Sequence, residues 1–296
     1  MLRSEVGKLR LISQKIASSD SKSAVDVVRW MTAVQAQDFS AAKWAIGSRC
    51  PGSVHHDVEL ALATGKIVRS WPMRGTLHFL AAEDLHWILS LTSTRIVNAA
   101  KTRHDAAGLT KTVIERARKA TLRALEGGGC LTRAEMHDVF RRAKIDPEKD
   151  RGYMLLWILA QAGVLCFGPV SGTSQTFVLA GEWIKKRRER ERDEALGELA
   201  LRYFRSHGPA TLRDFSTWSS LTLADAKIGL AVARSLLAEI EIDEIAYFLG
   251  PNVRDASLEK TDQIYALAAF EEFLLGYRDR DAVMASDRMK AIVPGA

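Results

Sequence analysis

One pattern recurs three times along this chain of 296 residues. Each copy combines helices, one of which starts at a Ser or Thr cap, with a longer apolar helix, a glycine and two strand-like runs. In the middle copy, Thr132 and Glu135 have the spacing of a capping box, and the apolar helix in "GYMLLWILAQAGVL" ends at Gly163. Such repetition constrains the fold strongly, because every copy must form the same small unit.

The outer copies follow the same order. In the third copy, Thr211 is the matching cap, the longer helix spans residues 223–237, and strands follow. In the first copy, Gly65 ends a helix and two β-prone runs flank "SWPMRG". Three helices followed by a hairpin is the order of a winged helix-turn-helix. We therefore predict a mainly α fold with small β-hairpins, built as tandem winged helix-turn-helix units.

The repeat also predicts where the chain divides. The mixed-charge run "WIKKRRERERDEA", from Trp183 to Ala195, is interpreted as an exposed connecting helix with Arg/Glu pairs four residues apart. The predicted domains are a first winged-helix unit with the "QAQ" triplet at 1–105, a second unit with the connecting helix at 106–192, a third unit at 193–255, and a C-terminal segment at 256–296.

Charge and composition narrow the class of protein. The formal net charge of +6 favours a polyanionic partner, although net charge says nothing about fold. No apolar run reaches the roughly 18 residues of a membrane span, and the N-terminal residues lack the pattern of a secretory signal. We therefore expect a cytoplasmic, nucleoid-associated protein without membrane contact.

Cysteine and histidine spacing argues against a metal. Cys50, Cys130 and Cys166 are far apart and form no CxxC or Cys/His ligand pattern, so we expect buried, unbridged thiols. His55 and His56 are adjacent and diverge, with no third ligand at a useful spacing. No nucleotide fingerprint or glycine-rich phosphate loop is present either. The expectation is a protein with neither metal nor cofactor.

Three segments occur in order along the chain: "VQAQDFSAAKWAIGSR", "RSWPMRGTLHFLAAEDL" and "AFEEFLLGYRDRDAV" with a following "VPG". Together they resemble the winged-helix DNA glycosylases related to the azinomycin-resistance glycosylase AlkZ, over nearly the whole chain. The marker of that family is a Gln-apolar-Gln triplet, which Gln35 to Gln37 match. The resemblance implies a monomeric, monofunctional glycosylase that removes N7-alkylated purines, bulky or crosslinked adducts included, from duplex DNA.

Glutamine can serve this reaction only by positioning groups, because an amide does not titrate near neutral pH. An N7-alkylated purine is already cationic and leaves as a neutral base, so geometry and electrostatics suffice. On a continuous helix Gln35 and Gln37 would point about 200° apart. Because Asp38 or Ser40 can cap the next helix, we expect the chain to leave helical geometry near Gln37 and the two amides to converge.

In this hypothesis Gln37 holds the attacking water and Gln35 orients that water or the deoxyribose. The alternative is that both amides cap the helix break. Arg74 and His78 in "MRGTLHF" are candidates for contacts with lesion-side phosphates or sugar, and Arg278 and Arg280 are candidates for facing the DNA. At the level of the whole protein, the alternative is a non-catalytic winged-helix regulator or a damage-binding protein.

Two features depart from the family pattern. The sequence stops at "AIVPGA", where the family continues into a C-terminal β-barrel, so the barrel is predicted to be incomplete. Either the chain is truncated or the protein lacks part of its lesion pocket, and we expect slow base release with intact DNA binding. The hairpin tip "PVSGTS" is uncharged, which argues against insertion of this hairpin into DNA.

Overall fold

The computed structural model describes residues 3–258, 261 and 263–284. The chain forms two compact units, one of residues 1–54 with 190–296 and one of residues 55–189. We refer to them as the discontinuous unit and the inserted unit. Of the predicted domain boundaries, only the one near residue 192 lies close to a boundary between these units. The division into three winged-helix domains stays a prediction.

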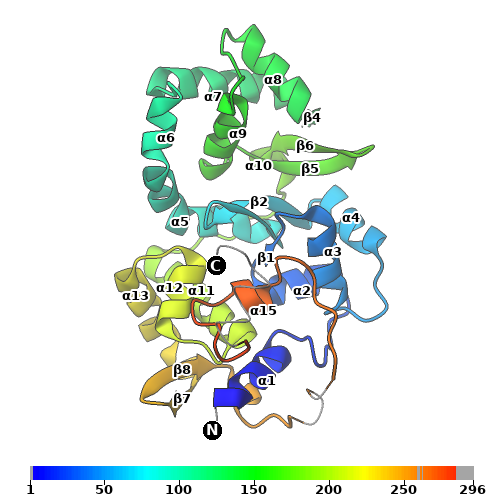
Figure 1. The fold of residues 1–296 in the computed structure, drawn as a ribbon. Coiled ribbons are helices and arrows are strands. Elements are labelled where there is room, and N and C mark those ends of the chain that lie inside the picture. Colours follow the sequence, from blue (N-terminus) through cyan, green and yellow to red (C-terminus); the bar gives the residue numbers. More distant parts are fainter. Residues whose placement is uncertain (1–2, 259–260, 262, 285–296) are drawn as a thin grey trace. The chain divides into compact units, whose positions relative to one another are not determined.

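The discontinuous unit is mainly helical (Figure 1). Its β7 and β8 form an antiparallel hairpin, and α13 packs against α11 and α12. Its elements are α1 Arg3–Ser13, α2 Ala24–Met31, β1 Val34–Gln35, α3 Phe39–Gly47, α11 Arg192–His207, α12 Leu212–Ser219, α13 Leu223–Ala233, the 3-10 turn Arg234–Leu236, β7 Ala238–Ile242, β8 Ile245–Leu249, α14 Pro251–Arg254 and α15 Glu272–Leu275.

The inserted unit combines helices with an antiparallel sheet, whose strands lie in the order β3-β2-β5-β6-β4 (Figure 1). Its hydrophobic core contains Trp71, Phe167 and Phe177 together with the apolar residues of α9. Its elements are α4 His55–Ala63, β2 Ile67–Met73, β3 Thr76–Ala81, the 3-10 turn Ala82–Asp84, α5 Leu85–Ala99, α6 Lys101–Ala106, α7 Lys111–Leu125, β4 Leu131–Thr132, α8 Arg133–Arg142, α9 Arg151–Gln161, β5 Leu165–Ser171, β6 Ser174–Leu179 and α10 Ala180–Trp183.

The predicted local signals are confirmed at the helix ends. Thr132 and Glu135 form a reciprocal capping box at the start of α8, and Thr211 forms another with Asp214 at the start of α12. Gly65 and Gly163 follow α4 and α9 with φ values of 65° and 68°, which glycine adopts without a steric penalty. Helices and antiparallel hairpins are therefore present, but the hairpins of the inserted unit join in one sheet, so the fold is a mixture of α and β structure and not mainly α with small hairpins.

The last helix of the middle copy does not have the exposure of a groove-reading helix. Every residue of α9 is buried except Arg151 and Tyr153, which are partly exposed. The helix packs against α5, α7, β2 and β5. A helix that is apolar on all sides belongs in a core, and α9 accordingly forms the centre of the inserted unit instead of a DNA-reading surface.

The predicted connecting helix from Trp183 to Ala195 is wrong. Trp183 is the last residue of α10, α11 starts at Arg192, and the residues between them are not helical. Arg188 explains part of this path: its backbone N–H donates to the Glu83 carbonyl at 3.1 Å, and its guanidinium lies 3.5 Å from an Asp84 oxygen. These contacts hold the chain extended along the inserted unit, and of the predicted Arg/Glu pairs four residues apart, the pair of Arg190 with Glu194 is present at the start of α11.

The structure also bears on the expectations for the cysteines, for the C-terminal segment and for membrane-spanning helices. Cys50 and Cys166 are buried as expected, whereas Cys130 is exposed. The predicted start of a barrel falls partly on residues 259–260, 262 and 285–296, which lie outside the described residues; the described part of 256–284 holds the short helix α15 and no strand. Within the described chain, no helix is both long and apolar enough to cross a membrane.

Candidate active site

Gln35 and Gln37 lie on an extended segment and not at a helix end. The helix α2 stops at Met31, because Thr32 adopts a φ of 67°, and the chain continues as β1. The prediction that the helix extends close to Gln37 is therefore wrong by several residues. Ala36 is fully buried, Gln35 is half-buried and Gln37 is exposed. Gln35 is the last residue of β1, and Gln37 lies at a bend between β1 and the Asp38 cap of α3.

The C-terminal end of this segment is fixed by the N-terminal cap of α3. The Asp38 carboxylate accepts the Ala41 backbone N–H at 2.8 Å and starts α3, which confirms one of the two predicted caps. The segment from Val34 to Gln37 thus connects α2 to α3 with defined geometry at both ends. The capping function belongs to Asp38, which leaves the amides of Gln35 and Gln37 outside the cap.

A buried carboxylate, Glu272 at the start of α15, anchors this segment. Its Oε1 accepts the Gln35 backbone N–H at 3.2 Å, and its Oε2 accepts the Trp218 indole N–H at 3.0 Å. The side chain is 1% exposed, and the His207 Nε2 lies 3.6 Å from Oε2. A buried carboxylate needs such donors, and here one of them is the backbone of the glutamine triplet.

Aromatic rings surround His207 and define where Glu272 lies. The Tyr203 ring stacks on the imidazole with centroids 4.8 Å apart, and the Trp218 ring lies at 5.2 Å. Gly276 passes so close that a Cβ there would lie 2.8 Å from the His207 ring and 2.6 Å from the Glu272 carbonyl oxygen. The glycine of "FLLGY" is therefore required by space, since any side chain would push α15 away.

A second buried carboxylate, Glu271, pairs with Arg49 at 2.6 Å, and the two side chains are 2% and 1% exposed. The same guanidinium donates to the Ala45 carbonyl at 2.8 Å and to the Gln14 side-chain oxygen at 2.9 Å. Both partners of the pair thus keep their hydrogen bonds in the core. This network joins α1, the end of α3 and the residue before α15.

Tyr277 completes the network around the anchor. Its hydroxyl donates to the His207 carbonyl at 2.6 Å and accepts from the Gln14 Nε2 at 2.9 Å. Burial raises the pKa of the Tyr277 hydroxyl well above its usual value, so the group stays protonated at neutral pH. The Arg10 guanidinium covers the ring at 3.6 Å from its centroid. Tyr277 therefore acts in packing, and its ring does not face solvent.

One polar atom of the triplet has no hydrogen-bond partner within the described part of the chain. The side-chain Oε1 of Gln35 is buried and accepts no bond there. A buried amide oxygen without a donor has a substantial cost unless a water or a substrate group supplies one. This oxygen can therefore accept a hydrogen bond from a water molecule beside the glutamine segment.

The predicted basic residues near the C-terminal segment lie in the discontinuous unit. Arg278 is exposed, and its backbone N–H donates to an Asp214 oxygen at 2.9 Å. Arg280 is half-buried. Arg278 borders a surface hollow of about 490 Å³ that also includes Arg213 and Tyr247. The side chain of Arg278 is thus accessible to a ligand, whereas that of Arg280 is only partly exposed.

Arg74 and His78 belong to the first hairpin of the inserted unit. Arg74 and Gly75 form its two-residue turn with φ values of 55° and 67°. His78 is fully buried, and its Nε2 accepts from Arg74 at 2.8 Å while its Nδ1 donates to the Thr76 carbonyl at 2.9 Å. We therefore assign His78 to holding Arg74 at the turn, because a buried ring does not contact phosphate.

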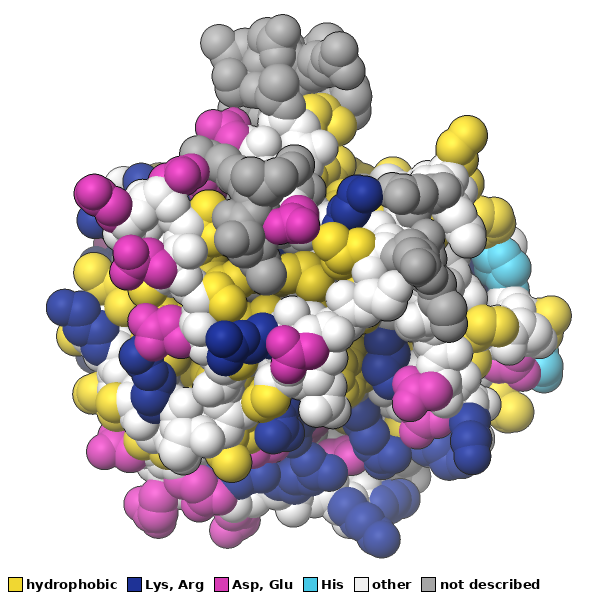
Figure 2. Space-filling view, turned by 90° about the horizontal axis from the view of Figure 1, so that it is seen from below, with side chains coloured by type: hydrophobic (Ala, Val, Ile, Leu, Met, Phe, Trp, Pro, Cys, Tyr) yellow, Lys and Arg dark blue, Asp and Glu magenta, His cyan; other side chains and the backbone are white. Residues whose placement is uncertain are grey.

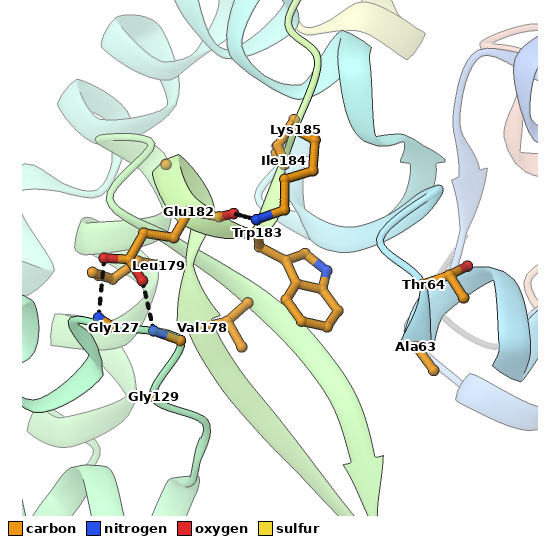
Figure 3. Close-up of a pocket in the computed structure, with 12 residues that line it drawn as sticks. Ala63, Thr64, Gly127, Gly129, Val178, Leu179, Glu182, Trp183, Ile184 and Lys185 are labelled. Carbon is orange, nitrogen blue, oxygen red and sulfur yellow. Dashed lines mark hydrogen bonds between the residues drawn. The ribbon is translucent and has the colours of Figure 1, made fainter.

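The inserted unit also contains a pocket of about 680 Å³, which is lined by the loop of Gly127 to Gly129, by α10 and by the end of α4 (Figure 3). Its carboxylate, Glu182, accepts the backbone N–H groups of Gly127 and Gly128 at 3.3 and 2.8 Å. These glycines have positive φ values and aim their amides at one anion, which the protein itself supplies. Among the residues that line this pocket, the titratable side chains are Glu182, which is already bonded to the two glycine amides, and Lys185.

The surface charge is unevenly distributed. On the face drawn in Figure 2, Lys and Arg side chains gather in the lower half of the view, and many carboxylates lie along its left side. Local excess of positive charge attracts polyanions more effectively than the net charge of +6 spread evenly would. This distribution agrees with the expectation of a polyanionic partner.

Sequence reasoning missed most of the residues that hold the glutamine segment. Arg49, Glu271, His207 and Trp218 carry no local signal, because burial of a charge depends on partners that are remote in sequence. The Glu271 partner of Arg49 is 222 residues away. The glycine and tyrosine of "FLLGY" were noticed only through the family resemblance, although the close approach at Gly276 now gives that pattern a physical reason.

Comparison with known proteins gives three matches. A family model described as AlkZ-like DNA glycosylase matches residues 28–296. A curated protein of Streptomyces sahachiroi, described as an interstrand DNA cross-link repair glycosylase, is 27% identical over 302 residues, which cover 97% of this chain and 80% of that protein. The solved structure of the Streptomyces sahachiroi DNA glycosylase AlkZ is similar with a TM-score of 0.81 and 25% identity, covering 98% of this chain and 82% of that one.

Proposed function

The chain belongs to the AlkZ-like DNA glycosylase family, and we propose that it is a monofunctional glycosylase that releases N7-alkylated purines from duplex DNA. The description of the Streptomyces sahachiroi relative supports including bulky or crosslinked adducts among its substrates. The order of helices and hairpins supports the winged-helix interpretation of its parts. We expect the protein to act as a monomer and without a metal or cofactor.

The observation that carries this proposal is the glutamine segment between β1 and α3, in which the buried Oε1 of Gln35 has no hydrogen-bond partner among the described residues and Gln37, two residues later, is exposed. The glycosidic bond of an N7-alkylated purine breaks with its electron pair moving to the base, which leaves neutral. Water then bonds to the sugar carbon and releases its proton to solvent. Neither step requires a titrating side chain, so two amides that position the water and the sugar are sufficient.

The roles of the two amides follow from their exposure. Gln37 is exposed and can hold a water that arrives from solvent, whereas the buried Oε1 of Gln35 can accept a hydrogen bond from that water, and the Gln35 side-chain N–H can donate to an oxygen of the deoxyribose. Two amides separated by one residue can act on one water or on neighbouring groups of one nucleotide. This arrangement supports the assignment of Gln37 to the water and of Gln35 to orientation.

Glu272 supports the same chemistry in two ways. Its bond to the Gln35 backbone fixes the segment, because the carboxylate is itself held by Trp218. Its negative charge lies in a buried environment close to the glutamine segment, where it favours a developing cation more strongly than a charge in water would. We assign Glu272 as a positioning residue of the site.

The activity is tested by incubating the protein with duplex DNA that carries a single N7-methylguanine. We expect free N7-methylguanine together with alkali-labile abasic sites, and no strand cleavage before alkali treatment, because a monofunctional enzyme leaves the sugar in place. Duplex without the lesion is the control. Tight binding of the damaged duplex without any base release would instead identify a non-catalytic damage-binding protein.

Replacing Glu272 by Gln should slow single-turnover base release by about 10- to 100-fold, the equivalent of losing one charge-assisted hydrogen bond. The amide keeps the shape and can still accept the Gln35 N–H, but it removes the charge and cannot accept from both donors. Affinity for undamaged duplex should change little. Glu272→Asp keeps the charge and should recover part of the rate, so a Gln variant as fast as the parent would exclude a contribution from the carboxylate.

A further inference from the structure

The helix α7 of the inserted unit carries a row of positive charges along one edge. Arg116, Lys119 and Arg123 follow one another at spacings of three and four residues, so their side chains project from the same side of the helix. All three side chains are exposed. The helix packs into the core through a different side, formed by Ala117, Thr121 and Leu125. We call this row the α7 basic edge.

No carboxylate of the described residues neutralises the α7 basic edge, since none lies within 4.0 Å of its three cationic groups. Three other exposed arginines of the same unit are paired, Arg103 with Asp150 at 3.5 Å, Arg118 with Glu115 at 3.6 Å and Arg141 with Asp138 at 2.6 Å. The pairing of Arg118 is informative, because it belongs to α7 but projects from another side. The edge thus keeps its full charge available for a ligand.

The spacing of the edge fits a phosphate backbone. From Arg116 to Arg123 the helix rises by about 10 Å, at 1.5 Å per residue. Phosphates of one DNA strand follow each other by about 3.4 Å along the duplex axis, so three cations over this length match about three successive phosphates. Long, flexible Lys and Arg side chains are the groups that most often make such contacts.

The two helices that a winged helix would use for this purpose are unsuited to it. The helix α9 is buried, as described above, and offers no surface to a ligand. The outward side of α13 and its following turn exposes Ile228, Val232 and Leu236, with exposed fractions of 40%, 53% and 49%. Apolar side chains do not neutralise phosphates. The helix α13 thus offers one exposed cation, Lys227, among these apolar side chains, whereas α7 carries a row of three.

We propose that the α7 basic edge binds the phosphate backbone of duplex DNA, as a contact of the inserted unit that is separate from the glutamine site. The choice of DNA as the polyanion rests on the proposed function. The three cations contact phosphates and not bases, so the edge contributes affinity independently of sequence and of the lesion. It keeps the protein on undamaged DNA and supplies part of the salt dependence of binding.

The test uses the full chain and undamaged duplex DNA of mixed sequence, with affinity measured by fluorescence anisotropy over a range of salt concentrations. In the triple variant Arg116→Gln, Lys119→Gln, Arg123→Gln, the slope of log K against log salt should fall in magnitude by about 2 to 3. At about 0.1 M salt, the affinity should fall more than tenfold. Both effects should be equal for sequences of different composition.

The matched control is the triple variant Arg103→Gln, Arg118→Gln, Arg141→Gln, which removes the same number of positive charges from paired positions of the same unit. Its salt slope should change by less than about 1. Equal losses in the two triple variants would show that net charge alone matters and would overturn the proposal. Thermal melting of all three proteins confirms that the comparison is made between folded chains.

A second polyanion separates DNA from RNA as the ligand. An RNA duplex of the same sequence should lose less affinity than DNA in the α7 triple variant, whereas a loss confined to RNA would overturn the assignment to DNA. Because every measurement uses undamaged nucleic acid, the result does not depend on base release. Failure of the glycosylase assay and failure of this proposal are therefore distinguishable.

Discussion

Replacing Gln37 by Ala is expected to slow single-turnover release of N7-methylguanine by about 10²-fold or more, the scale of losing one preorganised polar contact in an active site. The exposed amide is the group we assign to the attacking water, and Ala cannot hold that water. The affinity for duplex DNA should stay nearly unchanged, since the amide does not neutralise a phosphate. Single-turnover kinetics with enzyme in excess, together with anisotropy on the same duplex, measure the two quantities separately.

Two further variants test the roles of the pair. Gln37→Asp should retain much of the activity, because a carboxylate also accepts from the water and faces the sugar cation. Gln35→Ala should be intermediate if Gln35 only orients. If both alanine variants released base at the parent rate, or both melted at much lower temperature, the triplet would have a structural role and the catalytic assignment would fail.

Replacing Arg49 by Ala is expected to lower the free energy of unfolding by about 3–5 kcal/mol, because it leaves the Glu271 carboxylate buried without its cation. The pair is almost completely enclosed, with side chains 1% and 2% exposed and a separation of 2.6 Å. The loss also removes the donors to Ala45 and Gln14. Urea unfolding followed by circular dichroism gives the free energy and its midpoint.

Arg118→Ala is the matched control, since that arginine pairs with Glu115 at 3.6 Å on an exposed surface and should change the midpoint little. Combining Arg49→Met with Glu271→Leu should restore part of the stability, because removing both charges leaves neither one uncompensated. An Arg49→Ala protein that unfolds at the same urea concentration as the parent would contradict a stabilising role for the pair.

The parts of the fold that the sequence predicted correctly are those with local causes. The caps at Asp38, Thr132 and Thr211 and the glycines after α4 and α9 act within a few residues, so they can be recognised without knowing the rest of the chain. The three hairpins follow from alternating strand-prone residues around turns. These signals establish the order of helices and strands.

The errors arose where distant residues decide the structure. Apolar residues on every side of α9 indicate a buried helix, whereas a winged helix-turn-helix uses its last helix to contact DNA from the surface. The extended path after Trp183 depends on Glu83 and Asp84, about a hundred residues earlier in the chain. Gln35 and Gln37 were expected at a helix end, whereas the positive φ at Thr32 ends α2 earlier and leaves them on extended chain.

The site was predictable only in part for the same reason. The glutamine triplet was recognisable from a family resemblance, and the chemistry of an amide limited it to positioning. The anchor was not predictable, since the bond of Glu272 to the Gln35 backbone spans 237 residues. No periodicity or spacing in a single sequence records such a pairing.

That separation has a consequence for biosynthesis. The ribosome makes Gln35 first and Glu272 237 residues later, a delay of about 10–50 s at ordinary rates of translation. The inserted unit is synthesised and completed within that interval, whereas the part of the discontinuous unit that contains α1, α2 and α3 still lacks residues 190–272. A nascent chain that has not reached Glu272 therefore carries the glutamine triplet without its carboxylate anchor, and base release should begin only after Glu272 has been synthesised.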